Sequence, residues 1–239
     1  MKEKYVIFKD DDVGKDFQRL RRWVDIILKN NAKASIGLIG KYMKKSKIKK
    51  YLNSLDKERI EVFCHGYTHN HLPFLLIKII GRNRIYPTEF DRNSYMHNLS
   101  LRRYRKAEEK YLDSKTISFG PQGNIWNGSI VDPLVKKDFK IMFSWRKTDH
   151  DIFTIPLCDN LKQNSFEEFL KVYEKNKEKR IYTLQFHHAD LSDRQFELIN
   201  DVIDFFKNKE KRVFVNPKDI LEISKKDKEI LELISPINK

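Results

Sequence analysis

The chain of 239 residues is long enough for one large domain, and its formal net charge is +14. Because 40% of its residues are hydrophobic and 12% are aromatic, it can bury a full core, which excludes a disordered chain. Two cysteines are too few for a disulfide framework, and no run of about 18 apolar residues is present that could span a bilayer. We expect a single domain over residues 1–239.

The positive charge does not identify a partner by itself, because nucleic acid, an anionic membrane and an acidic substrate would all be attracted. Its densest run, residues 44–50, lacks the interleaved aromatic side chains of a base-stacking surface. We interpret this run as a solvated helix face and expect no nucleic-acid partner. The N-terminal segment lacks the apolar region of a signal peptide, so we expect a cytoplasmic location.

Apolar segments of strand length recur along the chain, and they are mostly unbroken, which is typical of strands buried on both faces. They cover residues 5–8, 34–38, 60–63, 116–119, 141–143, 152–155, 182–186 and 213–215. Amphipathic helical patterns lie between them, one beginning at Phe17 and another at Phe196. The alternation predicts an α/β fold with parallel strands, either a closed or nearly closed barrel of about seven units or an open doubly wound sheet.

The segment 72–80 breaks this alternation, because it is strongly apolar and is followed by Arg82 and Arg84. It is too short to cross a membrane. Two interpretations stay open: a buried insertion or subunit contact, and a peripheral membrane contact with the arginines of residues 72–84 toward lipid phosphate.

Three adjacent aspartates, Asp10, Asp11 and Asp12, follow the first predicted strand. Adjacent carboxylates repel one another unless a cation, hydrogen bonds or solvent relieves the charge. An acidic N-cap for the next helix is one interpretation. A cation site is the other.

Histidines gather after the predicted strand 60–63. His65 and His69 are four residues apart, and on a helical or tightly turned backbone this spacing directs both imidazoles to one point, as a divalent metal requires. His71 forms a second pair with His69, so the ligand register stays open.

Two further features also follow predicted strands. Residues 119–124 contain the glycines and proline of a tight turn, and His187 and His188 end the strand 182–186. In parallel α/β folds the loops at the carboxyl ends of the strands share one face. We therefore predict that the aspartates, the histidines and the turn meet in one cleft that holds a metal ion.

With these features the sequence resembles the polysaccharide deacetylase family, carbohydrate esterase family four, and especially its cytoplasmic branch with a basic residue and three aspartates in the first motif. Residues 8–14, 65–69 and 184–187 are similar to the first, second and last motifs. The resemblance spans residues 4–216. It implies a distorted (β/α)7 TIM-like barrel and a metal-dependent hydrolase, with Zn²⁺ as the expected cofactor.

The resemblance also implies a role for individual residues. The implied metal ligands are Asp12, His65 and His69, and the implied catalytic residues are Asp11 as base and His187 as general acid. The alternative carboxylate register, Asp10 with Asp11, stays open, as does His188 in place of His187.

The third and fourth motifs depart from the family. Phe119-Gly120-Pro121 stands in place of Arg-x-Pro, so the arginine that steadies the base is missing, and Arg146 is a candidate replacement. The fourth motif is only loosely suggested by Asp149 and Asp151 near Trp145. The implied substrate-binding residues are Gly120, Pro121, Gln122 and Trp145.

The expected activity is removal of an N-acyl group, N-acetyl in the first instance, from a sugar, sugar nucleotide or lipid-linked glycan used in surface glycan biosynthesis. Because the third motif is degraded, a catalytically inactive glycan-binding protein of the same fold is one alternative. Because His69 and His71 form an H-x-H pair, a metal-dependent amidohydrolase or phosphoesterase is the other. The sequence does not predict the oligomeric state.

Overall fold

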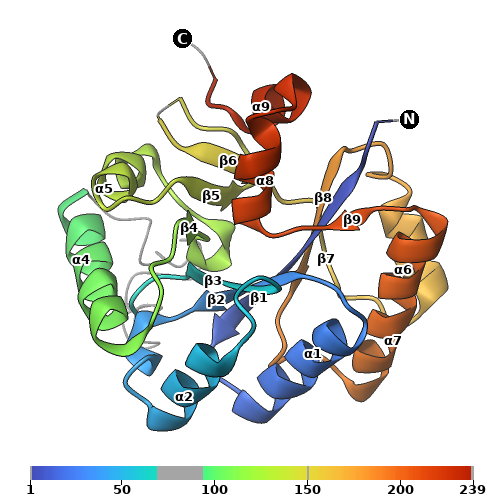
Figure 1. Cartoon of the computed structure of the whole chain (residues 1–239), viewed down its shortest axis with the longest axis horizontal. Coiled ribbons are helices and arrows are strands. Elements are labelled where there is room, and N and C mark those ends of the chain that lie inside the picture. The colour runs from blue at the N-terminus through green and yellow to red at the C-terminus, as the bar shows by residue number, and fades with distance from the viewer. Residues whose placement is uncertain (1, 69–93, 150, 238–239) are drawn as a thin grey trace, which may run out of the picture.

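The computed structural model describes residues 2–68, 94–149 and 151–237 (Figure 1). Its strands are β1 (Tyr5–Val13), β2 (Ala34–Leu38), β3 (Ile60–Cys64), β4 (Ser118–Phe119), β5 (Ile141–Ser144), β6 (Phe153–Pro156), β7 (Asp159–Asn160), β8 (Ile181–Phe186) and β9 (Val213–Phe214). Its α-helices are α1 (Phe17–Lys29), α2 (Ser46–Ser54), α4 (Ser94–Tyr111), α5 (Val131–Lys136), α6 (Phe166–Tyr173), α7 (Asp193–Asp204), α8 (Pro217–Ser224) and α9 (Lys228–Ile234). The predictions for His69, His71 and residues 72–84 lie outside the described residues.

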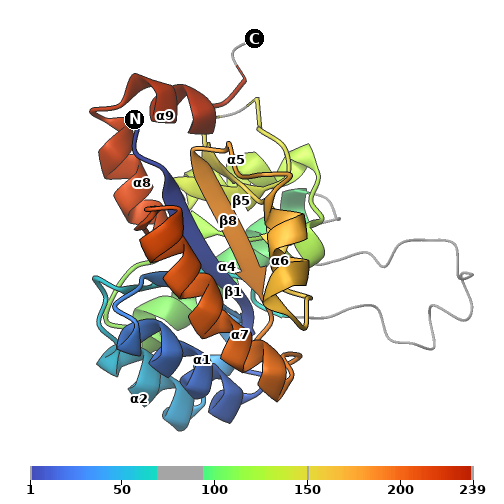
Figure 2. The same cartoon turned by 90° about the vertical axis from the view of Figure 1, so that its right-hand side faces the viewer.

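The strands form one parallel sheet in the order β6-β5-β4-β3-β2-β1-β8-β7, with β9 also pairing with β1. The segment after β6 connects strands that lie near opposite ends of this order. Leu157 N donates to Ser144 O of β5, and Cys158 N donates to Thr183 O of β8. The sheet is therefore curled, and helices that include α1, α2, α6 and α7 lie on its outer side (Figures 1 and 2). The predicted distorted (β/α)7 barrel is confirmed, and the open doubly wound alternative is wrong.

Both faces of β1 are buried, as its unbroken apolar sequence predicts. Val6 and Phe8 belong to a large cluster that includes the apolar faces of the outer helices. Ile7 belongs to a second cluster on the inner side of the curl, where Phe63 of β3 and Phe143 of β5 meet at a ring-centroid distance of 5.1 Å. Residues of α8 and α9 complete this inner cluster.

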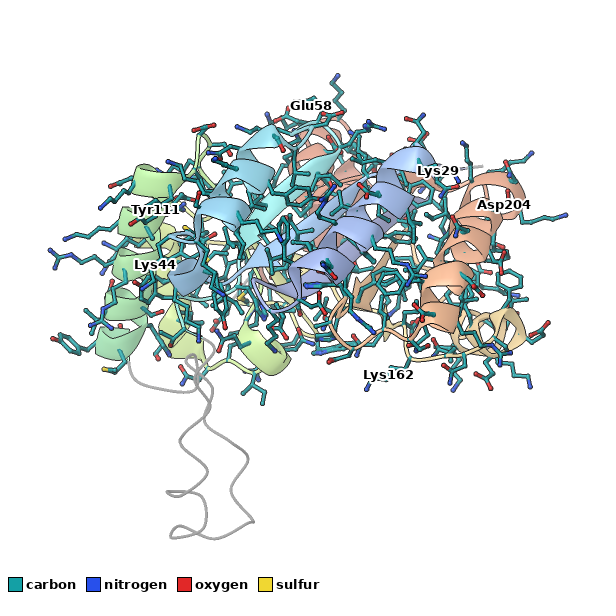
Figure 3. The ribbon with its side chains drawn as sticks, turned by 90° about the horizontal axis from the view of Figure 1, so that it is seen from below. Lys29, Lys44, Glu58, Tyr111, Lys162 and Asp204 are labelled. Atoms are coloured by element: carbon teal, nitrogen blue, oxygen red, sulfur yellow. The ribbon has the colours of Figure 1, made fainter. Side chains whose placement is uncertain are left out.

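The helices predicted at Phe17 and Phe196 are present and begin at side-chain caps. Asp16 accepts hydrogen bonds from two backbone amides of the first turn of α1, and Ser192 forms a capping box with Gln195 at α7. Lysines such as Lys44 project outward from the surface (Figure 3). Among the described helices, none is long and apolar enough to cross a membrane.

Candidate active site

The three aspartates lie within β1, which extends beyond the predicted segment 5–8 to Val13. The register with β2 is irregular here: Asp10 pairs with Ile36 and Val13 with Leu38, so Asp11 and Asp12 together face a single residue of β2. Asp12 has a φ of 68°, in the left-handed region that aspartate adopts more readily than most residues. In a regular strand adjacent side chains point to opposite faces, and such a bulge redirects one of them.

The bulge brings both carboxylates to the same histidine. Oδ1 of Asp12 lies 3.5 Å from Nε2 of His65, and Oδ1 of Asp11 lies 3.7 Å from Nδ1 of the same ring. The second oxygen of Asp11 lies 3.9 Å from Nε2 of His187, which follows β8. Residues from β1, β3 and β8 therefore meet at the carboxyl ends of their strands, where sites of parallel α/β folds are built.

His65 is held in an orientation suited to metal binding. Its Nδ1 lies 2.8 Å from the carbonyl oxygen of Gly120, and because a carbonyl can only accept, Nδ1 carries the proton. Nε2 then presents its lone pair toward Asp12 when the ring is neutral. Burial lowers the pKa of His65, but the nearby Asp11 and Asp12 carboxylates outweigh it and raise the pKa above its ordinary value.

The turn after β4 supports the histidine loop. Gly120, Pro121 and Gln122 are buried. The side-chain amide of Gln122 donates to the carbonyl oxygens of His65 at 3.0 Å and Thr68 at 2.5 Å. These contacts show how the turn fixes the His65 backbone, whereas the substrate-binding role predicted for all three residues stays a prediction.

Asp10 and His188 form a separate pair. Asp10 accepts a hydrogen bond from His188 N at 2.8 Å and another from His188 Nδ1 at 2.6 Å, and both side chains are fully buried. Burial raises the pKa of Asp10, although His188 counteracts it. Of the two open registers, the geometry favours Asp11 with Asp12 and leaves His187, 36% exposed, as the accessible histidine.

Two lysines neutralise the carboxylates. Nζ of Lys9 lies 2.5 Å from Oδ1 of Asp11, with both side chains buried. Nζ of Lys15 lies 2.5 Å from Oδ2 of Asp12, and this lysine side chain is 39% exposed. The sequence indicated a cation beside the aspartates, but it did not indicate that a strand lysine would point inward.

The loop between β5 and β6 forms part of the surroundings. Trp145 is 54% exposed, so it can stack on a ligand, but no contact tests its predicted substrate-binding role. The guanidinium of Arg146 lies 4.5 Å from the ring centroid of Trp126. Among the described residues, the cation in contact with Asp11 is instead the ammonium of Lys9. Asp149 and Asp151 are exposed.

Several site residues were not predicted. Gln185 accepts from Lys9 Nζ at 3.1 Å and from Asn124 Nδ2 at 3.3 Å, and its own Nε2 lies 3.3 Å from His187 Nε2. Trp126 donates from Nε1 to Ser144 Oγ at 3.0 Å. The signal available in the sequence was the polar Gln185 inside an otherwise apolar strand.

The residues present fit a divalent metal in the chemistry of their donor atoms. Asp12 and His65 offer the carboxylate oxygen and imidazole nitrogen that zinc accepts, and the Gly120 carbonyl fixes the tautomer of His65. The third predicted ligand, His69, lies outside the described residues. Within the described residues alone, no group of three histidine, cysteine or acidic side chains is placed to hold a metal.

Comparison with known proteins identifies the fold. No protein-family model and no curated protein sequence matches the chain. Among solved structures, a provisionally named polysaccharide deacetylase from Mycobacterium smegmatis is similar with a TM-score of 0.67 and 12% identity, covering 100% of this chain and 94% of that one. A family 4 acetyl xylan esterase from Clostridium thermocellum, in complex with a cobalt ion, gives 0.66 and 13%, covering 93% and 92%.

A pseudoenzyme of carbohydrate esterase family 4 from Bacillus anthracis is also similar, with a TM-score of 0.62 and 15% identity. The match covers 88% of this chain and 63% of that protein, so this chain spans less than two thirds of its length. At these identities the likeness shows the fold alone. The fold is that of the carbohydrate esterase family 4 deacetylases, and it occurs in an inactive protein as well as in esterases.

Proposed function

We propose that the chain is a metal-dependent carbohydrate N-deacetylase, which hydrolyses an N-acyl group, N-acetyl in the first instance, on a sugar. The observation that carries this proposal is the convergence of Asp11, Asp12 and His65 with the accessible His187 at one rim of the barrel. These two carboxylates and two histidines can serve a metal-assisted amide hydrolysis as base, metal ligands and acid.

Asp12 and His65 would hold the metal, with His69 as the proposed third ligand and Zn²⁺ as the expected ion. When bound, such an ion polarises a carbonyl oxygen and makes water a stronger acid. Lys15 must then leave or share the carboxylate of Asp12, since its ammonium now lies 2.5 Å from Oδ2.

Asp11 is the proposed general base. Its Oδ1 is held by Lys9, so Oδ2 is the oxygen placed toward His187 and the reacting groups. Water adds to the acyl carbon as Asp11 takes one of its protons, and the carbon–nitrogen bond then breaks. His187 gives a proton to the departing nitrogen, so the products are a carboxylic acid and an amino sugar.

The substrate is proposed to be an N-acylated sugar, sugar nucleotide or lipid-linked glycan of surface glycan biosynthesis. The similarity of the fold to an acetyl xylan esterase supports an acylated carbohydrate. A membrane contact through residues 72–84 and a cytoplasmic location stay predictions.

The test combines metal analysis of the purified protein with a screen for acetate and formate release from N-acylated sugars and sugar nucleotides. We expect release by the wild-type protein and its loss in Asp11→Asn, with metal content unchanged. The exposed Asp201 of α7 provides the control substitution Asp201→Asn, which should retain activity. Equal activity on lipid-linked and free sugars would exclude a requirement for the lipid and would leave the proposed reaction unaffected.

A catalytically inactive glycan-binding protein is the second candidate. It is favoured by Phe119 in the place of the expected arginine and by the pseudoenzyme that shares the fold. In this case the wild-type protein and Asp11→Asn would bind an oligosaccharide equally and release no acid, although the wild-type protein contains metal.

A further inference from the structure

We propose that Lys9 is a positioning residue of the candidate active site, which supplies from inside the barrel the cation that holds Asp11. This inference deepens the proposed function and rests on it for the role of Asp11. The turn after β4 offers no such cation, because Phe119, Gly120 and Pro121 are uncharged. Arg146 stacks on Trp126.

The burial of Lys9 is the first evidence. Its side chain has no exposed surface although it lies in the middle of β1. A lysine removed from water is costly unless its ammonium is paired and hydrogen-bonded. Here Nζ donates to Asp11 Oδ1 at 2.5 Å and to Gln185 Oε1 at 3.1 Å, so the charge is compensated by these two acceptors.

Two aromatic rings also lie near the ammonium of Lys9. Nζ lies 5.2 Å from the ring centroid of Phe63 and 5.4 Å from that of Phe143. The face of an aromatic ring attracts a cation, but this attraction does not replace the hydrogen bond that a carboxylate accepts from an ammonium. The buried ammonium of Lys9 therefore has the carboxylate of Asp11 as its ion-pair partner.

Two glycines leave room for this pair. A Cβ on Gly120 would lie 3.3 Å from Cε of Lys9, and a Cβ on Gly37 would lie 3.2 Å from Oδ1 of Asp11. Both would also come within 2.6 Å of the ring of Phe63. Strand β2 and the turn after β4 therefore have no side chain at the two positions that lie against Asp11 and Lys9.

The pair of Lys9 and Asp11 also lies close to His187, the proposed general acid. Lys9 occupies Oδ1 of Asp11, which leaves Oδ2 facing His187 at 3.9 Å. Gln185 accepts from Lys9 and lies 3.3 Å from Nε2 of His187 through its amide nitrogen. Removing the ammonium would release the rotamer of Asp11 and remove one of the hydrogen bonds that hold Gln185, the residue in contact with His187.

The test uses Lys9→Met, which retains most of the side-chain volume and removes the charge, in the metal-loaded full-length protein. Because a misplaced reacting group costs about 100-fold, we expect kcat for acyl release to fall about 100-fold while KM changes less than about threefold. Metal content should not change. Lys136→Met, on the exposed surface of α5, should match the wild-type protein.

Lys9→Ala separates positioning from packing. Propylammonium, which can enter the vacated space and donate N–H hydrogen bonds, should restore part of kcat, whereas tetramethylammonium, which carries the charge without donors, should not. A crystal structure of Lys9→Met should show Asp11 rotated away from its wild-type rotamer, with Asp12 and His65 in place. This readout does not depend on turnover.

A folded, metal-loaded Lys9→Met protein with wild-type kcat and an unmoved Asp11 would overturn the inference. If the wild-type protein releases no acid but the variant still displaces Asp11, the proposed function fails and the positioning by Lys9 stands. If Lys9→Met does not fold, Lys9→Met/Asp11→Asn removes both charges. Recovery of folding in this double variant supports the pairing, and continued failure assigns Lys9 a packing role alone and overturns the inference.

Discussion

Asp10 and His188 are joined by two hydrogen bonds, one from the backbone amide of His188 at 2.8 Å and one from its Nδ1 at 2.6 Å. The two residues are 178 positions apart in the sequence. They connect the carboxyl end of β1 to the residue that follows His187. The proposed base and the proposed acid are each one residue away from this pair, so the distance between them depends on it.

Breaking this pair should destabilise the protein strongly. Asp10→Ala leaves His188 buried without its acceptor, and removing one partner of a buried ion pair costs about 3–5 kcal/mol. The measurement is urea denaturation of Asp10→Ala and of Asp201→Ala, an exposed control on α7 that should stay within about 0.5 kcal/mol of wild type. A loss below about 1 kcal/mol in Asp10→Ala would show that His188 finds another partner.

Asp12 combines a proposed metal ligand with a left-handed backbone conformation, and two substitutions separate these properties. Asp12→Asn and Asp12→Ala should both lower metal affinity, because each removes the carboxylate. In metal-free protein, Asp12→Ala should be less stable than Asp12→Asn by about 1 kcal/mol, since asparagine adopts a φ of 68° at a lower cost than alanine. Chemical denaturation in the presence of a chelator measures the difference, and equal stability would exclude strain at this position.

The sequence predicts a helix or strand well when the residues of that element alone determine it, and poorly when contacts with distant segments determine it. The segment 34–38 was predicted with both of its bounds, because an unbroken apolar run of strand length indicates a buried strand. β7 was missed because Asp159–Asn160 is two polar residues long and exists only through pairing with β8. β1 was predicted too short because charged residues rarely continue a buried strand.

At the candidate site, the sequence predicts which types of residue gather but not which of them contact one another. Three aspartates and the following histidines indicated a cluster, yet the approach of Asp12 rather than Asp10 to His65 depends on a bulge opposite Gly37. The pairing of Lys9 with Asp11 depends on neighbouring strands that leave room for it. Such relationships between distant segments are set by packing, which single-sequence patterns do not contain.

Glu61 should make the stability of the protein depend on pH. It is partly buried and accepts hydrogen bonds from Ser118 Oγ and from the backbone amide of Lys218 at the start of α8. Burial raises the pKa of Glu61 from its ordinary 4.5 to about 7, opposed by Ser118 and Lys218 and increased by Asp219. Glu61 therefore links β3 to α8 rather than belonging to the metal site.

Between pH 4.5 and about 7 the folded protein keeps a proton on Glu61 that the unfolded chain has released. The free energy of unfolding should fall as the pH rises through this window, by at most about 3 kcal/mol. Glu61→Gln keeps an acceptor and a donor without titrating, so its stability relative to wild type should increase from pH 5 to pH 8. Denaturation midpoints across this range test the difference, with the exposed Glu232→Gln as control; parallel curves for all three proteins would contradict the raised pKa.

Gly37 and Gly128 provide a matched test of the space around Asp11. A Cβ on Gly37 would lie 2.6 Å from the buried ring of Phe63 and 3.2 Å from Oδ1 of Asp11, whereas a Cβ on Gly128 would meet nothing within 4 Å. Because the ring of Phe63 is fully enclosed, it cannot move aside without disturbing its neighbours. Gly37→Ala should therefore cost about 1–3 kcal/mol and lower acyl release, since the base is displaced together with the ring.

Gly128→Ala should leave acyl release unchanged and raise stability slightly, by about 0.4–1 kcal/mol, because alanine reduces the conformational entropy of the unfolded chain. Urea denaturation and acid-release assays on both variants make the comparison with the same chemical change in each. If Gly37→Ala has wild-type stability and activity, the ring of Phe63 moves aside at little cost. The close packing around Asp11 then does not hold the proposed base in place.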